Sequence, residues 1–139
     1  MMTMPVSEKD LLEAGENALA ACPHLFQEEI RKDFELRIVV VGSRVFPFRI
    51  DSQKKKLTQF DWRYGHFLLE FTECRIPEKV ETSLKRFLKA WNLLSGSFDL
   101  IVDKLGQFWF LECNQDGAWG WLDEIVGGGD IRCIRNDFL

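Results

Sequence analysis

Two acidic side chains and one amide lie within a short stretch of this chain and could together hold a divalent cation. Residues 98–119, with the sequence FDLIVDKLGQFWFLECNQDGAW, predict two strands joined by a tight turn. Asp99 lies on the first arm, and Glu112 and Asn114 lie on the second. Mg²⁺ binds a few protein oxygens and completes its shell with waters and substrate phosphates, so this donor set suits it. The alternative is an exposed strand pair whose charges are solvated.

The register of this hairpin decides whether the two acids meet. If residues 104–107 form a four-residue loop, Asp103 pairs with Phe108 and Asp99 falls directly opposite Glu112. Opposed residues have Cβ atoms roughly 4.5–5.5 Å apart, and like charges held there repel, a conflict that a bound cation removes. Alternation of side chains gives each arm one shared face, with Asp99, Ile101 and Asp103 on the first arm and Phe108, Phe110, Glu112 and Asn114 on the second.

The length and composition indicate a single domain, residues 1–139, with enough apolar material for a core. Of the 139 residues, 46% are hydrophobic, and the net charge of −4 argues against a nucleic-acid partner because phosphate contacts need a basic face. No apolar run approaches a membrane span, so no membrane partner is expected. Four scattered cysteines in a chain that starts without a signal peptide predict reduced thiols and a cytoplasmic location.

Around the candidate metal stretch, the sequence predicts an α+β fold, an antiparallel sheet covered by one or two helices. The spacing of apolar residues after Pro77 predicts an amphipathic helix, which Gly96 is expected to end. Gly42-Ser43 predicts a two-residue hairpin turn, and Pro47 places the second arm at a sheet edge or a bulge. The other predicted elements are a helix capped by Ser7 that extends to about Ala21, and strands at residues 25–30, 35–41, 44–51 and 67–74.

Three strings follow one another in an order that is specific as a set. They are CPHLFQEEIRKDFELRIVVVGSRVFPFRIDSQ, then DWR, then FDLIVDKLGQFWFLECNQDGAW, and they lie within residues 22–121. This order resembles the C-terminal part of the ATP-grasp ligases, above all the peptide-modifying branch with the microviridin-type macrocyclising ligases and the enzymes that add glutamate to a ribosomal protein. The resemblance implies a C-terminal ATP-grasp lobe that serves a ligase. Such a ligase uses Mg-ATP to activate a carboxylate as an acyl phosphate, which an amine or hydroxyl then attacks.

The resemblance also implies how ATP would be held. Gln27, Glu28, Glu29 and Ile30 match the hinge strand against which the adenine lies, largely through backbone groups. Glu35 matches the acidic position that holds the ribose hydroxyls. Because a hinge that acts through its backbone tolerates many side chains, Glu28 and Glu29 also fit ordinary exposed strand residues.

Two arginines and the three candidate metal ligands match catalytic positions of the family. Arg37 in the triplet E-L-R and Arg63 in D-W-R match residues that contact phosphates or substrate. Asp99, Glu112 and Asn114 match three magnesium ligands. Metal and arginine together suit phosphoryl transfer, which depends on positioning and on neutralising charge. Surface arginines in ordinary ion pairs are the alternative for Arg37 and Arg63.

An ATP-grasp enzyme clamps its nucleotide between two lobes, and the resemblance covers only one, without the N-terminal lobe and the substrate domain. We therefore expect the isolated chain to bind Mg-ATP weakly and to lack ligase activity, because the nucleotide would be exposed on one side. One hypothesis is a half-domain that acts on a peptide after completion by another polypeptide or an N-terminal region. The alternatives are a non-catalytic binding module, which would form a homo-oligomer, and a truncated product without an independent role.

Overall fold

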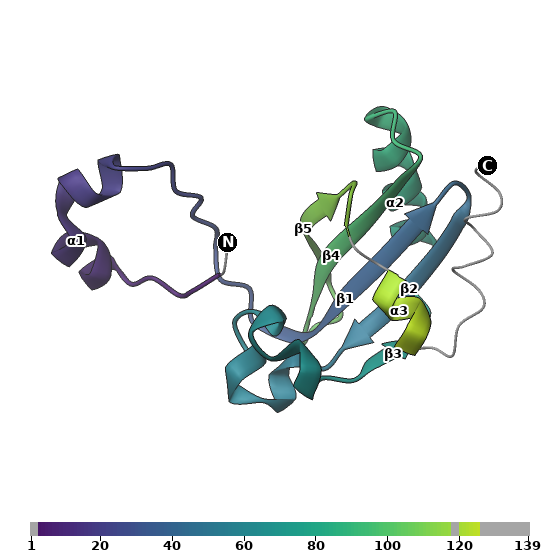
Figure 1. Cartoon of the computed structure of the whole chain (residues 1–139), viewed down its shortest axis with the longest axis horizontal. Coiled ribbons are helices and arrows are strands. Elements are labelled where there is room, and N and C mark those ends of the chain that lie inside the picture. Colours follow the sequence, from purple (N-terminus) through teal and green to yellow (C-terminus); the bar gives the residue numbers. More distant parts are fainter. Residues whose placement is uncertain (1–2, 118–119, 126–139) are drawn as a thin grey trace.

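The computed structural model describes residues 3–117 and 120–125 and confirms the α+β fold. Its centre is a five-stranded antiparallel sheet with the strand order β3-β2-β1-β4-β5 (Figure 1). The strands are β1 (Lys32–Val41), β2 (Arg44–Ile50), β3 (Phe71–Glu73), β4 (Ser95–Asp103) and β5 (Phe108–Asn114). The helices are α1 (Glu8–Ala20), α2 (Glu78–Ala90) and α3 (Gly120–Ile125), with the 3₁₀ turns η1 (Ser52–Lys54), η2 (Lys56–Thr58) and η3 (Trp62–Leu68).

The predicted hairpin of β1 and β2 is confirmed, with Gly42 and Ser43 as its turn. Gly42 has a φ of +57°, which the two-residue turn requires and glycine adopts without strain. Pro47 is tolerated within β2 because of the direction in which its backbone groups point. Its carbonyl oxygen accepts a hydrogen bond from the Cys74 nitrogen, so the side of Pro47 that lacks an N–H faces away from β1. The ladder between β1 and β2 therefore loses nothing there, as expected for a position beyond the end of β3.

Helix α2 forms as predicted after Pro77, but the prediction that Gly96 ends it was wrong. The helix ends at Ala90, and Gly96 lies inside β4. Asn92 takes the positive-φ position instead, at +53°. The Asn92 nitrogen donates to the Lys89 oxygen and the Leu93 nitrogen donates to the Leu88 oxygen, which is the Schellman pattern of hydrogen bonds. Asparagine can fill this position because its short polar side chain tolerates the left-handed conformation.

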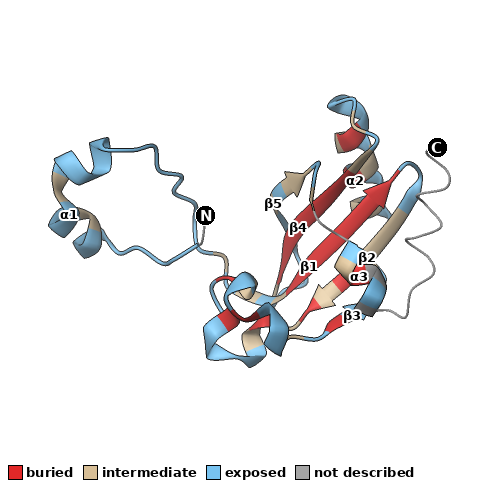
Figure 2. Cartoon of the chain, viewed as in Figure 1, coloured by how far each residue is buried: buried red, intermediate tan, exposed pale blue. Residues whose placement is uncertain are grey.

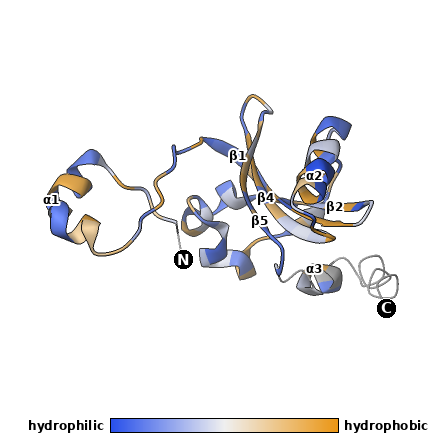
Figure 3. Ribbon diagram, turned by 90° about the horizontal axis from the view of Figure 1, so that it is seen from above, coloured by the Kyte–Doolittle hydropathy of each residue, from blue (hydrophilic) through white to orange (hydrophobic). Residues whose placement is uncertain are grey.

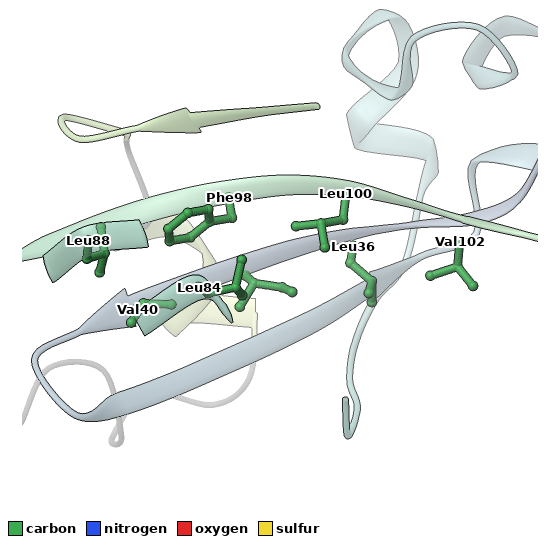
Figure 4. Packing of buried hydrophobic residues seen from close by; sticks show 8 residues of the cluster. Leu36, Val40, Leu84, Leu88, Phe98, Leu100 and Val102 are labelled. Atoms are coloured by element: carbon green, nitrogen blue, oxygen red, sulfur yellow. The ribbon is translucent and has the colours of Figure 1, made fainter. Parts of the chain in front are cut away.

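One face of the sheet packs against α2 and forms the main core. In Figure 4, Leu84 and Leu88 of α2 lie over the strand residues Phe98 and Leu100. Alternation along each strand selects this set, because every second residue of β1 and β4 points to the same face. The buried members are Leu36, Ile38, Val40, Leu84, Leu88, Phe98, Leu100 and Val102.

The opposite face of the sheet is divided into an apolar half and a polar half. The apolar half is covered by α3, which lies on the side of the sheet away from α2 (Figure 3). Trp62 and Trp121 pack there, whereas Trp119 lies outside the described residues. The buried apolar members are Val39, Val41, Phe48, Ile50, Phe71 and Leu122. The polar half is formed by β1, β4 and β5 and carries the candidate site.

The N-terminal part of the chain extends away from the sheet. Ser7 caps α1 as predicted, through reciprocal bonds with Asp10, and no residue of α1 is buried (Figure 2). The prediction of a strand at residues 25–30 was wrong, because residues 23–31 belong to no strand and lie outside the sheet (Figure 1). A lone extended segment turns its backbone donors and acceptors to water, and a strand requires a neighbour to bond them. The strand predicted at residues 67–74 shortens to β3 because η3 uses its first part.

Two further properties of the described residues concern their cysteines and the lengths of their helices. Cys22, Cys74 and Cys113 are free thiols, as predicted, and Cys133 lies outside the described residues. Within the described residues, each helix is too short or too polar to cross a membrane.

Candidate metal and phosphate site

Three charged side chains form a row across three adjacent strands on the polar half of the sheet. Arg37 of β1 pairs in register with Asp99 of β4, and Asp99 pairs in register with Glu112 of β5. Residues paired in this way project their side chains to the same face, so the row places one guanidinium and two carboxylates next to one another. The predicted opposition of Asp99 and Glu112 is confirmed.

The turn that joins β4 and β5 differs from the prediction. Val102 pairs with Phe108, and the Asp103 nitrogen donates to the Gln107 oxygen, so the loop is one residue shorter than predicted. The Asp103 carboxylate accepts hydrogen bonds from the Leu105 and Gln107 nitrogens, which stabilises the shorter turn. Gly106 has a φ of +77°, the conformation that a three-residue hairpin loop demands at its last position. This role of Asp103 in the turn was not predicted.

A β-bulge restores the register that the shorter turn would otherwise shift. The pairing changes between Asp99 and Leu100, and Leu111 of β5 is the extra residue. The prediction that Phe108 and Phe110 share a face with Glu112 was therefore wrong. Phe110 lies 5.6 Å from Phe87 of α2 between ring centroids, on the main-core side of the sheet. The bulge reverses the alternation, so that the strand presents Phe108 and Phe110 to the α2 side of the sheet and the Glu112 carboxylate to the opposite face.

Asn114 lies two residues beyond Glu112 on the same face and completes the candidate donor set. Its Nδ2 atom donates to the Glu112 Oε1 atom over 2.8 Å, which leaves the amide oxygen out of this bond. Asn114 pairs in register with Ser97, whose buried hydroxyl oxygen has no hydrogen-bond partner among the described residues. Gly117 packs directly on Ser97, since a Cβ atom at Gly117 would lie 2.9 Å from that oxygen. Sequence reasoning missed both residues.

Burial and charge make Asp99 an unusual carboxyl group. Only 8% of the residue is exposed, and burial raises its pKa to about 6. The neighbouring Glu112 carboxylate adds to this rise, whereas the Arg37 guanidinium opposes it. The Arg37 Nη1 atom donates to both Asp99 oxygens over 2.7 Å. A divalent cation would relieve the remaining conflict by favouring the ionised form of both acids.

Arg63 approaches the same site from η3 and is held by Asp61. Its Nε and Nη2 atoms donate to the two Asp61 oxygens over 2.8 Å and 2.7 Å, a bidentate fork. These bonds raise the pKa of the Arg63 guanidinium, and the charges of Glu112 and Asp99 add to the rise, which places Arg63 within their field. Asp61 is buried and also caps η3 by accepting from the Arg63 nitrogen. The supporting role of Asp61 was not predicted, although its place in D-W-R was the available signal.

Glu35 lies on the same face of β1 as Arg37, closer to the beginning of the strand. It is buried, and its Oε1 atom accepts a hydrogen bond from the Lys32 Nζ atom over 2.8 Å. Lys32 also donates to the oxygen of Phe60, which lies between η2 and η3, and so connects this end of β1 to the 3₁₀ turns. The structure therefore brings Glu35 and the two arginines to the side of the sheet that carries the acids. It does not bring in Gln27, Glu28 and Glu29, which are exposed, or Ile30, which is half-buried, because all four precede β1 in the extended arm.

The charge balance leaves one acid of this region without a cationic partner. Glu112 forms no ion pair among the described residues, and its described hydrogen bond is with the Asn114 amide. No cluster of three His, Cys, Asp or Glu side chains that could hold a metal occurs in the described part of the chain, so a third protein ligand would have to be another oxygen donor, such as the Asn114 amide. Two carboxylates and one amide oxygen fit Mg²⁺ by their chemistry. The other three acids of this region each form an ion pair: Glu35 with Lys32, Asp99 with Arg37, and Asp61 with Arg63.

Comparison with solved structures identifies the fold around this site. The RiPP-associated ATP-grasp ligase of Chryseobacterium gregarium, solved with ADP and a leader and core peptide, is 35% identical, with a TM-score of 0.83. The alignment covers 89% of this chain and 37% of that one. The chain has the fold of the C-terminal part of an ATP-grasp ligase. No protein-family model and no curated protein matches it.

Two further ATP-grasp enzymes show the same likeness. The macrocyclase MdnC of Microcystis aeruginosa MRC, solved with the precursor peptide MdnA, is 31% identical, with a TM-score of 0.82 over 100% of this chain and 42% of that one. The macrocyclase MdnB from the same organism is 30% identical, with a TM-score of 0.66 over 82% of this chain and 40% of that one. The chain thus spans about two fifths of the length of these ATP-grasp proteins.

Proposed function

We propose that this chain is the Mg-ATP-binding lobe of a peptide ligase that joins a carboxylate to an amine or hydroxyl through an acyl phosphate. The observation that carries the proposal is the pairing of Asp99 with Glu112 on the polar face, with Asn114 bonded to Glu112. The likeness to ATP-grasp peptide ligases supports it, since the structure of the relative that is 35% identical contains ADP and a peptide. We extend that role to residues 22–121 as the ATP-grasp lobe.

The three candidate ligands have distinct parts in this proposal. Asp99 and Glu112 supply negative oxygens, and Asn114 supplies its amide oxygen while its Nδ2 atom orients Glu112. When bound there, Mg²⁺ would neutralise charge on the phosphates of ATP. Ser97 and Gly117 support the ligands from below, because the contact of Gly117 with Ser97 holds the chain after β5 close to the sheet.

The arginines and Glu35 complete the proposed ATP site. Arg63 presents a planar guanidinium whose direction is set by the Asp61 fork, and its side chain is 41% exposed, so a phosphate can reach it. Arg37 lies beside the metal ligands and would serve the same phosphates. The Glu35 carboxylate would accept hydrogen bonds from the ribose hydroxyls once its bond with Lys32 is broken. Residues 27–30 would bind the adenine through their backbone N–H and C=O groups, which are free to do so because this segment belongs to no strand.

The experiment that tests this proposal is a calorimetric titration of ATP into the chain with and without Mg²⁺. Wild-type protein is compared with Glu112→Ala, and we expect the Mg²⁺-dependent part of the binding heat to disappear in the variant. Glu73→Ala is the matched control, because Glu73 is also an exposed strand glutamate but lies on β3, at the other edge of the sheet. Equal Mg²⁺-dependent binding by wild type and Glu112→Ala would remove the metal assignment.

We further propose that the lobe acts only when completed by a second polypeptide or by additional chain. The exposed N-terminal arm supports this, since α1 buries no residue and Leu12 is 76% exposed. Exposed apolar side chains on an ordered helix are typical of an interaction surface. Tight nucleotide binding by the isolated chain would contradict the need for completion. A stable homo-oligomer whose formation ignores Mg-ATP would instead favour the non-catalytic binding module.

A further inference from the structure

Two arginine–aspartate pairs flank the candidate site, and their geometries differ. Arg63 meets Asp61 with two different nitrogens, Nε and Nη2, each bonded to its own carboxylate oxygen. Arg37 meets Asp99 with a single nitrogen, Nη1, which lies 2.7 Å from both oxygens. The Arg37 Nε atom is buried and has no hydrogen-bond partner among the described residues. One pair is a closed fork, and the other leaves a buried donor unused.

An unused buried donor indicates that the Arg37–Asp99 pair is not the best arrangement for either group. Native structures bond nearly all buried polar atoms, and leaving one unbonded costs about 1–3 kcal/mol. A fork like that of Arg63 would satisfy two donors at once. The Arg37 guanidinium thus holds Asp99 while keeping at least one donor available for another acceptor.

The position of Arg37 makes it a direct competitor of any cation at this site. Asp99 lies between Arg37 on one side and Glu112 on the other in the row across the sheet. Only 10% of the Arg37 side chain and 12% of the Asp99 side chain are exposed, so solvent screens the attraction between them weakly. A metal ion that binds Asp99 meets a positive charge already in contact with both oxygens.

We propose that Arg37 is the internal counter-ion of the metal site: it neutralises Asp99 in the metal-free chain and is displaced from it when a divalent cation binds Asp99 and Glu112. This inference rests on the proposed metal site and adds a function that the ligand assignment does not contain. Arg37 lowers the affinity of the empty lobe for free Mg²⁺ and keeps the buried acid stable until the metal arrives. Once displaced, the guanidinium carries its donors, including the unbonded Nε, towards the phosphates that accompany the metal.

The first test measures binding of Mn²⁺ alone, without nucleotide, by the loss of the free-ion paramagnetic resonance signal. Because removal of a positive charge in contact with a ligand strengthens cation binding, Arg37→Gln is expected to bind Mn²⁺ about tenfold more tightly than wild type. Arg37→Lys keeps the charge and is expected to stay within about threefold of wild type. The same Arg37→Gln protein should melt at a lower temperature without metal, so affinity and stability move in opposite directions.

Arg49→Gln is the matched control for these variants. Arg49 also pairs with an aspartate, its Nε atom lying 2.7 Å from the Asp51 Oδ1 atom, but it points to the other face of the sheet, over the Phe34 ring. Its replacement is expected to leave Mn²⁺ affinity unchanged. A merely structural arginine at position 37 would behave like Arg49 in this assay, or would weaken Mn²⁺ binding by disordering the site.

The outcomes separate the counter-ion role from the metal site itself. Equal or weaker Mn²⁺ binding by Arg37→Gln, together with its loss in Glu112→Ala, would overturn the counter-ion role and leave the metal site standing. Absence of Glu112-dependent Mn²⁺ binding in both wild type and Arg37→Gln would overturn the proposed metal function and the counter-ion role with it.

A second measurement on the wild type avoids dependence on the folding of Arg37→Gln. In nuclear magnetic resonance spectra, the guanidinium nitrogens of Arg37 should report restricted rotation without metal, because a carboxylate holds them. Addition of Mg²⁺ alone should shift these signals and restore faster rotation, while the signals of Arg63 in its fork report no release. If Asn114 signals move on Mg²⁺ addition and the Arg37 signals do not, the displacement is excluded.

Discussion

The carboxylates of Asp99 and Glu112 lie on the same face of the sheet because one bulged residue of β5 separates the apolar part of that strand from its polar part. If Leu111 were paired regularly and not bulged, the alternation that turns Phe108 and Phe110 towards the α2 side of the sheet would turn Glu112 to that side as well. The polar face would then lose one of its two acids. β-Bulges commonly redirect side chains beside functional sites, and this one has that effect.

Deletion of Leu111 should remove the bulge without moving Glu112 off the polar face. Glu112 would then follow Phe110 directly, and adjacent residues of a regular strand point to opposite faces, so Glu112 stays opposite Asp99 and Phe110 stays on the α2 side. We expect the free energy of unfolding, measured by urea titration, to change by under about 2 kcal/mol. Leu111→Ala keeps the bulge and should also cost under about 2 kcal/mol, because this side chain is only half-buried. A loss above about 3 kcal/mol in the deletion variant alone would contradict the assignment of Leu111 as the extra residue.

The raised pKa of Asp99 should make the metal-free chain less stable as the pH rises through 6. A carboxyl whose pKa is about 6 when folded and 3.8 when unfolded favours the folded state fully below pH 4, and this contribution is lost as the pH passes 6. The difference corresponds to roughly 3 kcal/mol. Comparison of wild type with Asp99→Asn between pH 3 and 7 isolates it, because all other titrating groups are shared.

Mg²⁺ should reduce this pH dependence, since a bound cation keeps Asp99 ionised in the folded state. The increase in melting temperature caused by Mg²⁺ should consequently be larger at pH 7 than at pH 5. Asp99→Asn should show a small increase at both pH values. A wild-type melting temperature that rises relative to Asp99→Asn from pH 5 to pH 7 without metal would contradict the shift assigned to this group.

Asp61 should contribute to stability with the opposite pH dependence. Burial raises its pKa, but hydrogen bonds from the Arg63 side chain and from the Thr3 and Arg63 nitrogens outweigh burial and hold the pKa below its ordinary value. Its contribution is therefore present above pH 4 and lost as the pH falls below that value. Asp61→Asn should cost about 1–3 kcal/mol at pH 7 by leaving Arg63 unpaired.

The matched control for Asp61 is Asp51, which also forms ion pairs but is more exposed. Asp51 pairs with Arg49 and Lys54, and 27% of its side chain is exposed, against 3% for Asp61. Because exposed ion pairs contribute little, Asp51→Asn should cost under about 1 kcal/mol in the same urea titration. A similar loss for both variants would show that burial of the Asp61 fork carries no extra stability.

Asn92 should tolerate glycine and reject alanine. With a φ of +53° it occupies the left-handed position of the Schellman motif, where a Cβ atom is unfavourable and glycine is preferred. Asn92→Gly should raise stability by up to about 1 kcal/mol, and Asn92→Ala should lower it by about 1 kcal/mol. Lys89→Gly in the last turn of α2 is the control and should be destabilising by about 0.5–1 kcal/mol, since that position is helical. Thermal unfolding followed by circular dichroism distinguishes these signs.

The sequence alone determined the features that depend on local pattern. Gly42-Ser43 predicts a hairpin because few residues accept its turn geometry, and the apolar spacing after Pro77 predicts α2 because only a helix gathers those residues on one face. The ordered strings around Arg37, Arg63, Asp99, Glu112 and Asn114 predicted the ATP-grasp fold, and structural comparison confirmed it.

Only the tertiary structure decided how these residues meet. The shorter turn at Asp103 shifts the register by one residue, and the bulge at Leu111 shifts it back. The predicted pairing of Asp99 with Glu112 therefore results from two deviations that no local sequence pattern predicts. The single-nitrogen contact of Arg37 and the fork of Arg63 are likewise invisible in the sequence, where both are simply arginines. Partner choice depends on distances between strands far apart in the chain, and packing fixes those distances after local structure has formed.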